Sequence, residues 1–160
     1  MALITTIGAG IYTTLKYNEA STVPASVSAF DALTGTVGTV SDIREFPSFG
    51  TPANIVNVPV YGEAQSSQIS GQADAPTLEF TLNYKADGHD TLQDLVGNNK
   101  TYAFEIALKN TSGSTGDDAV FYVLGTFASF TITPNLTDTN QATLTLATQG
   151  SYVGPVATSA

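Results

Sequence analysis

The sequence contains no cysteine and no tryptophan, and it has a single methionine and a single histidine. Without cysteine the chain can form neither disulfide bonds nor thiolate metal sites, so packing and backbone hydrogen bonds must hold the fold. A Ser-His-Asp triad needs a histidine, and His89 is the only one. Because His89 lies on the apolar side of a short predicted helix, a packed or surface histidine is favoured over a catalytic one.

Positive charge is also scarce. The basic residues, scattered along the chain, are Lys16, Arg44, Lys85, Lys100 and Lys109. The formal net charge is −9. Because binding to a phosphate backbone needs several basic side chains acting together, the composition disfavours a protein that grips nucleic acid or anionic lipid.

Long apolar segments are missing as well. The longest apolar run spans residues 119–125, far below the ~20 residues that cross a bilayer. The first six residues lack the basic and apolar regions of a secretory signal. We therefore expect no membrane partner and a protein that is made and used in a cytoplasm, or released from it.

What the sequence does contain favours β-structure. Threonine, which is β-branched and suits a half-exposed pleated surface, supplies 24 of the 160 residues. Hydrophobic residues reach 42%, enough for one packed core, while charged residues reach only 12%. We predict a single β-rich domain over residues 1–150, with residues 1–30 as a candidate N-terminal arm and residues 151–160 as a flexible C-terminal tail.

The clearest strands show alternation with a period of two residues. At residues 77–84, Leu78, Phe80 and Leu82 share one face, and residues 102–108 repeat the pattern with Glu105 on the opposite face. Such alternation is typical of half-buried strands in an antiparallel sheet. Further strands are predicted at residues 11–17, 36–43, 55–61, 119–124, 127–133 and 142–148. Pro59 in the run 55–61 indicates an edge strand or a bulge.

One short helix is predicted at residues 88–96, flanking the sheet. Asp87 is the expected N-cap, and Gly97 can take the left-handed conformation after the last turn. The residues predicted to face the sheet are His89, Leu92, Leu95 and Val96, whereas Asp90 and Asp94 point to water.

We predict loops at residues 45–54, 62–76 and 110–118. A structureless loop as long as 62–76 is unusual inside a compact domain and tends to be functional, unless it extends a neighbouring hairpin beyond the domain.

The sequence contains no recognisable motif for catalysis or for binding a metal or a phosphate. Asp117 and Asp118 are adjacent in a polar loop, and the acids of the predicted helix are spaced for a solvated face. Neither group resembles a twelve-residue calcium loop, and the glycines do not fit a phosphate-binding spacing. We predict that the protein is not an enzyme and uses no metal and no cofactor.

A resemblance to a known family rests on the order of several segments. These are TVGTVSDI at 36–43, IVNVPVY at 55–61, GQADAP at 71–76, LEFTLNY at 78–84, LQDLV at 92–96 and YAFEI at 102–106. Together they resemble the tail tube, or major tail, proteins of siphoviruses, which are bacteriophages with long flexible tails. The similarity covers roughly residues 30–150 and includes no catalytic motif.

The resemblance implies a fold and an assembly. The fold would be mainly β, an antiparallel β-sandwich of two sheets with one short flanking α-helix and long loop or terminal arms. Six copies would close into a ring, and rings would stack into a tube in the virion, assembled in the cytoplasm of the bacterial host. The implied partners are copies of the chain itself and other tail proteins such as the terminator, tape measure and distal tail proteins. DNA would pass without binding.

Two groups of residues are candidates for these roles. The candidate ring-stacking residues, all within the long loop, are Gly62, Gln65, Gln68, Gly71 and Asp74. The candidate acids of the channel wall are Asp42, Glu63, Glu79 and Glu105. A basic wall would bind duplex DNA over many phosphates, whereas an acidic, threonine-lined wall would repel it and let it slide.

Other functions remain open at this stage. The chain could be another virion component, such as a tail terminator or a capsid decoration protein. It could also be a carbohydrate-binding β-sandwich, although such sites usually present exposed aromatic rings. The absence of tryptophan and the placement of most tyrosines within strands disfavour that alternative.

Overall fold

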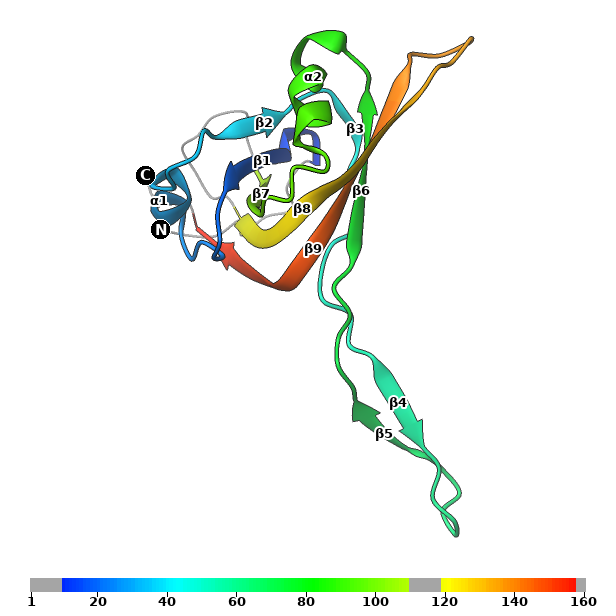
Figure 1. Ribbon diagram of the computed structural model, residues 1–160. Coiled ribbons are helices and arrows are strands. Elements are labelled where there is room, and N and C mark those ends of the chain that lie inside the picture. Colours follow the sequence, from blue (N-terminus) through cyan, green and yellow to red (C-terminus); the bar gives the residue numbers. More distant parts are fainter. Residues whose placement is uncertain (1–9, 110–118, 158–160) are drawn as a thin grey trace.

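The computed structural model describes residues 10–109 and 119–157 (Figure 1). The strands are β1 (Thr14–Glu19), β2 (Gly38–Val40), β3 (Ile43–Glu45), β4 (Ile55–Val58), β5 (Ser67–Ser70), β6 (Thr77–Asn83), β7 (Tyr102–Leu108), β8 (Ala119–Thr133) and β9 (Gln141–Val156). The helices are η1 (Gly10–Tyr12), α1 (Val27–Asp31) and α2 (Ala86–Leu95). The predicted mainly β, antiparallel fold is confirmed. The predicted loop 110–118, with Asp117 and Asp118, lies outside the described residues.

Seven strands form one sheet that curls into a nearly closed barrel. Its order is β2-β1-β7-β8-β9-β6-β3, with every pair antiparallel. The two end strands, β2 and β3, therefore run in the same direction, and only Ser41 and Asp42 separate them. They form one kinked strand that pairs first with β1 and then with β6. The sheet thus encloses its core as one folded layer in place of two separate sheets.

The kink in this strand lies at Asp42, whose φ of 57° is uncommon for a residue other than glycine. The backbone N–H of Asn83 donates to the Asp42 carbonyl at 2.9 Å, which ties the kink to the end of β6. The single strand predicted at residues 36–43 is therefore interrupted where the chain changes its pairing partner.

The barrel interior holds the larger of two cores. Leu78, Phe80 and Leu82 of β6 are fully buried, as the alternation predicted. Phe80 lies opposite Leu144 of β9, and the ring of Phe127 meets the Phe104 ring edge-on at 5.2 Å. Full burial of one such side chain contributes about 1.5–3 kcal/mol, so this interior is the main source of stability.

A second core lies on the outer side of β7 and β8. Every residue from Tyr102 to Ala107 is buried, because α1 covers the face that the sequence pattern left open to water. Phe30 of α1 is fully buried, and its ring centre lies 5.6 Å from that of Tyr122. The helix begins at Ser26, whose side chain accepts a hydrogen bond from the Ala29 N–H at 3.2 Å. The predicted exposed face of this strand was therefore wrong.

Both predicted terminal segments differ from the structure. Residues 14–31 contain β1 and α1 and belong to the domain, so the described part of the segment 1–30 is not an arm. At the other end, β9 continues to Val156, and Val153 pairs with Tyr122 of β8. The predicted start of the flexible tail, at residue 151, is therefore too early. The last strand continues to Val156 because it can pair with the long edge of β8.

The strand β8 also runs through the break predicted after residue 124. Gly125 makes this continuity possible, because a Cβ there would lie only 2.6 Å from the Ala147 carbonyl oxygen. The register shifts along the β8–β9 pair indicate β-bulges, which let a long strand bend without ending.

Helix α2 packs over the open end of the barrel beside the kinked strand (Figure 1). The cap position is Lys85, not the predicted Asp87, and Gly88 with φ of 99° marks a kink inside the helix. His89 is completely buried, as expected for a packed residue. Its Nδ1 accepts from the Lys85 N–H at 3.1 Å, and its Nε2 lies 3.2 Å from the Ser41 carbonyl oxygen, to which it can donate.

Substitution of His89 therefore tests how α2 is held. We expect His89→Ala to lower the free energy of unfolding by about 2–4 kcal/mol, because the Lys85 N–H and the Ser41 carbonyl both lose their partner. Asp94→Ala, an exposed change on the same helix, should stay within about 0.5 kcal/mol of the parent. Urea titration followed by circular dichroism measures both. Equal stabilities of the two variants would contradict this account of the helix.

No helix among the described residues is long and apolar enough to span a membrane.

Candidate assembly surfaces

A two-stranded arm, residues 51–75, projects from the barrel between β3 and β6 (Figure 1). Its strands β4 and β5 form their own antiparallel sheet, separate from the barrel. All of its residues are exposed except Val58, which is half-buried. The predicted loop 62–76 is thus the tip and returning strand of this hairpin. Pro59 follows β4 directly, which explains why the predicted strand 55–61 ends early.

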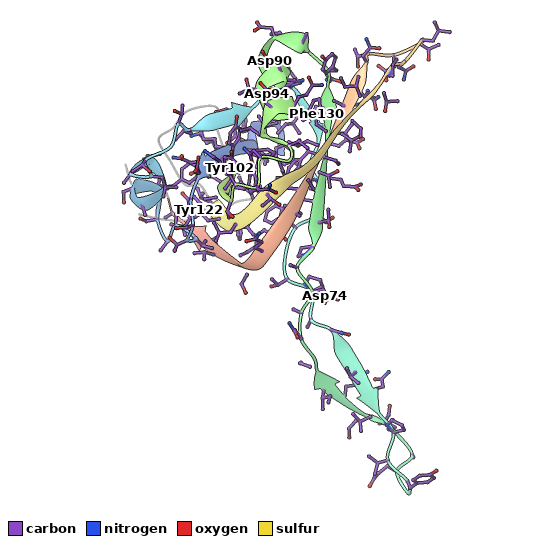
Figure 2. All side chains as sticks on the ribbon, viewed as in Figure 1. Asp74, Asp90, Asp94, Tyr102, Tyr122 and Phe130 are labelled. Carbon is purple, nitrogen blue, oxygen red and sulfur yellow. The ribbon has the colours of Figure 1, made fainter. Side chains whose placement is uncertain are left out.

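All five candidate ring-stacking residues lie on this one arm. Gly62 sits in the turn at the tip with φ of 90°, and Gln65 follows it. Gln68 belongs to β5, and the Gly71 N–H closes the hairpin by donating to the Asn54 carbonyl at 2.6 Å. Asp74 lies at the root, where the arm leaves the domain (Figure 2). The structure brings these residues together on one projection, and their role in stacking stays a prediction.

The arm exposes large apolar side chains that no described part of the chain covers. The exposed ones are Ile55, Val56, Val60, Tyr61 and Ile69. Val56 and Ile69 lie directly opposite each other across the two strands. An isolated two-stranded hairpin is marginally stable in water at best. A projecting hairpin with this apolar content is therefore typical of a segment that packs on another molecule.

A polar face covers the outer side of the barrel over β6, β9 and the second half of β8. Along β6 it alternates with the buried leucines, and in register Glu79 neighbours Thr145, which neighbours Ser129. The residues of the polar face are Glu45, Thr77, Glu79, Thr81, Asn83, Ser129, Thr131, Thr133, Gln141, Thr143 and Thr145. Six of the 24 threonines thus lie together on one continuous sheet surface.

The only charges on the polar face are two carboxylates. Glu79 lies on its central rows, and Glu45 lies on β3 opposite Thr81. The sequence identified Glu79 but missed Glu45, because residues 45–54 read as a loop. With no basic side chain among its members, this face has a weakly negative potential and no cation that could hold a phosphate.

The other candidate acids of the channel wall lie elsewhere. Asp42 is exposed at the kink between β2 and β3, and Glu63 lies at the tip of the arm. Glu105 is buried, with 5% of its surface exposed, on the side that α1 covers. The structure therefore does not bring the four acids together, and the choice of Glu105 as a residue of a water-filled wall was wrong.

Glu105 instead forms a buried polar contact. The Tyr122 hydroxyl donates to its carboxylate at 2.9 Å, and the Lys16 ammonium lies 3.7 Å away. Burial, and then the nearby Glu105 carboxylate, raise the pKa of Tyr122 far above its usual value. The tyrosine therefore stays protonated and keeps its donor role.

A single variant and a double variant test this contact. Glu105→Ala should lower the free energy of unfolding by about 1–3 kcal/mol, because the Tyr122 hydroxyl is left buried without an acceptor. Glu105→Leu combined with Tyr122→Phe removes both partners and should cost less than the single change. If the double variant is the less stable of the two in urea titrations, the contact does not act as described.

Two further cations form exposed ion pairs. Arg44 binds Asp138 at 2.9 Å, and Lys100 binds Glu19 at 2.8 Å. The guanidinium of Arg44 hydrogen-bonds the Asp138 carboxyl and lowers its pKa. Such exposed pairs contribute little to stability. Arg44 and Asp138 still fasten the β8–β9 turn to β3, at one border of the polar face.

No metal-binding constellation occurs in the described residues, where no three His, Asp or Glu side chains gather in a suitable group. The two extended surfaces that the described residues form are the polar face and the arm.

Comparison with known proteins adds one finding. No protein-family model matches the sequence, and no curated protein does. Twelve chains of solved structures are similar in fold. One comes from the cryo-EM structure of the baseplate of the anti-feeding prophage, described as 6-fold symmetrised. It is 10% identical, with a TM-score of 0.59 over 94% of this chain and 95% of that chain. The chain therefore shares the fold of this baseplate chain. At this identity the likeness concerns the fold alone.

Proposed function

We propose that the chain is a structural subunit of a phage tail tube, in which identical copies close into rings and the rings stack. The observation that carries this proposal is the likeness to the baseplate chain, which spans almost the full length of both chains. The 6-fold symmetry applied to that baseplate supports rings of six copies. The sequence resemblance supports a siphovirus major tail protein, located in the virion, with the other tail proteins as neighbours.

The polar face is the surface that would line the bore. Duplex DNA carries one negative charge per ~1.7 Å of its axis. A wall of threonine, asparagine and glutamine with only Glu45 and Glu79 as charges offers no site where a phosphate can bind. Repulsion from these acids extends about 8–10 Å in physiological salt, which matters in a narrow channel. DNA would therefore pass this wall without being held.

The arm is the element that would connect one ring to the next. It is the longest projection among the described residues (Figure 1). A head-to-tail contact between copies closes into a ring when its rotation allows, and a projection beyond the ring then reaches the next layer.

A second candidate follows from the identity of the structural neighbour. Since that chain belongs to a baseplate, this chain could form a single ring of a baseplate or terminator and never extend into a tube. A carbohydrate-binding module is less well supported, since Tyr61 is the only aromatic side chain among the large exposed apolar residues of the described part.

Electron microscopy of the purified chain tests the proposal. Across a concentration series, negative-stain images should contain rings with a central hole and tubes built from them. Sedimentation velocity should report species much larger than 16.6 kDa. Single rings that never stack would favour the baseplate or terminator function. Monomers at every concentration would refute both.

A further inference from the structure

The arm has two strand edges that face solvent. Within the described residues β4 pairs only with β5, so each strand has one unpaired side. The hydrogen bond from Gly71 N–H to the Asn54 carbonyl makes that pair a hydrogen-bonded one. Since such pairs alternate along an antiparallel ladder, Val56 and Val58 turn their backbone groups inward. Ile55 and Asn57 of β4 therefore turn their N–H and C=O groups outward, as do Gln68 and Ser70 of β5.

These edges lack the features that usually block strand pairing. Neither β4 (IVNV) nor β5 (SQIS) contains a charged residue or a proline. Soluble proteins commonly place lysine, proline or a bulge on an exposed edge, because an open edge pairs readily with another strand. The barrel, by contrast, has short end strands that are parts of one kinked strand. The arm is thus the part of the fold that is most ready to accept a further strand.

The charge of the arm indicates which molecule provides the further strand. Each copy carries a net charge of −9, so most of its surface repels another copy. Residues 46–73, which include both strands of the arm, contain Glu63 as their only charged residue. Two arms can therefore approach with little like-charge repulsion, limited to Glu63 at the tip and Asp74 at the root, whereas a basic partner would gain little electrostatic attraction there. A second copy of this chain is the partner that fits.

We infer that β4 of one copy pairs in antiparallel fashion with β5 of the arm of the next copy, so that neighbouring arms join into a continuous β-belt. The contact is head-to-tail, and it can therefore repeat around a ring. Backbone hydrogen bonds provide the pairing, as in β-strand addition. The apolar side chains of Val56 and Ile69 then form one stripe along the belt. This inference rests on the proposed function, because it names how assembled copies meet.

Hydrogen–deuterium exchange on the assembled full-length protein tests the belt. Assemblies are exposed to D₂O, dissociated under quench conditions and compared with unassembled chains exposed in the same way. The outward amides of Ile55, Asn57, Gln68 and Ser70 should exchange at least about 100-fold more slowly in the assembly. Assemblies in which these amides exchange as fast as in free chains would overturn the belt and leave the tube proposal standing. A chain that never assembles would overturn both.

A pair of variants separates the backbone group from the side chain. Asn57→Pro removes an outward N–H while leaving the ladder inside the arm intact. Asn57→Ala removes the same side chain and keeps the N–H. The proline variant should raise the protein concentration needed for assembly by roughly tenfold or more, and the alanine variant should assemble like the parent. Equal assembly of both variants would contradict the belt, and circular dichroism confirms that both barrels are folded.

Discussion

Replacement of the arm, residues 51–75, by a short Gly-Ser linker is expected to leave the barrel folded and to abolish the growth of rings into tubes. No arm residue belongs to either core, so removal takes no buried side chain from the domain. The hydroxyl of Thr148 donates to the carbonyl of Pro76, which the replacement retains. Loop closure by a linker of different length costs well under about 1 kcal/mol per doubling. The apolar side chains and open edges that would contact another copy are lost together.

Two measurements on this variant are decisive. Circular dichroism melting should give a transition close to that of the parent, and electron microscopy should reveal no tubes at concentrations where the parent forms them. Glu63→Gln, which changes the only charge between residues 46 and 73, is the matched control and should still form tubes. If the variant without the arm forms normal tubes, the arm is not needed for the stacking of rings.

The largest change in stability is expected for Phe30→Ala. Phe30 is completely buried under α1 and packs on Tyr122 of β8. Removal of its ring should lower the free energy of unfolding by about 3–5 kcal/mol, since it leaves a cavity in a small core. Domains of this size have a total stability of only about 5–15 kcal/mol. The variant should therefore be partly unfolded at moderate temperature.

Urea titration of Phe30→Leu keeps this prediction measurable if the alanine variant does not fold. Leucine should give a smaller loss than alanine, because it fills part of the cavity. Tyr61→Ala removes an aromatic ring that is fully exposed on the arm, and its effect should stay within about 0.5 kcal/mol. A Phe30→Leu variant as stable as the parent would mean that α1 does not cover a real core.

The sequence predicted those elements whose side chains have one buried and one wet face. The strand β6 follows this rule, with Leu78 and Phe80 inside and Glu79 outside, and its bounds were correct to one residue. The packed position of His89 also followed from its helical spacing. The five candidate stacking residues lie on one projection because they belong to one continuous polar segment.

The features that the sequence did not predict depend on contacts between segments that are distant in sequence. Helix α1 has only five residues, too few to show a helical period. Because it covers β7, Glu105 is buried, although the alternation of its strand placed it in water. The partner change at Asp42 and the pairing of β4 with β5 are matters of register, which composition does not encode. The place of Glu45 on the polar face was missed because it follows from the pairing of Glu45 with Thr81.

The central claim is that the polar face turns inward around a narrow bore, and the absence of cysteine makes it directly measurable. Thr145→Cys places one thiol on the polar face, and Asp94→Cys places one on the exposed side of α2. In intact tubes, a maleimide coupled to a bulky polymer should label Cys at position 94 and leave position 145 unlabelled. After dissociation both should react. Equal labelling of position 145 in tubes and in free subunits would contradict the account.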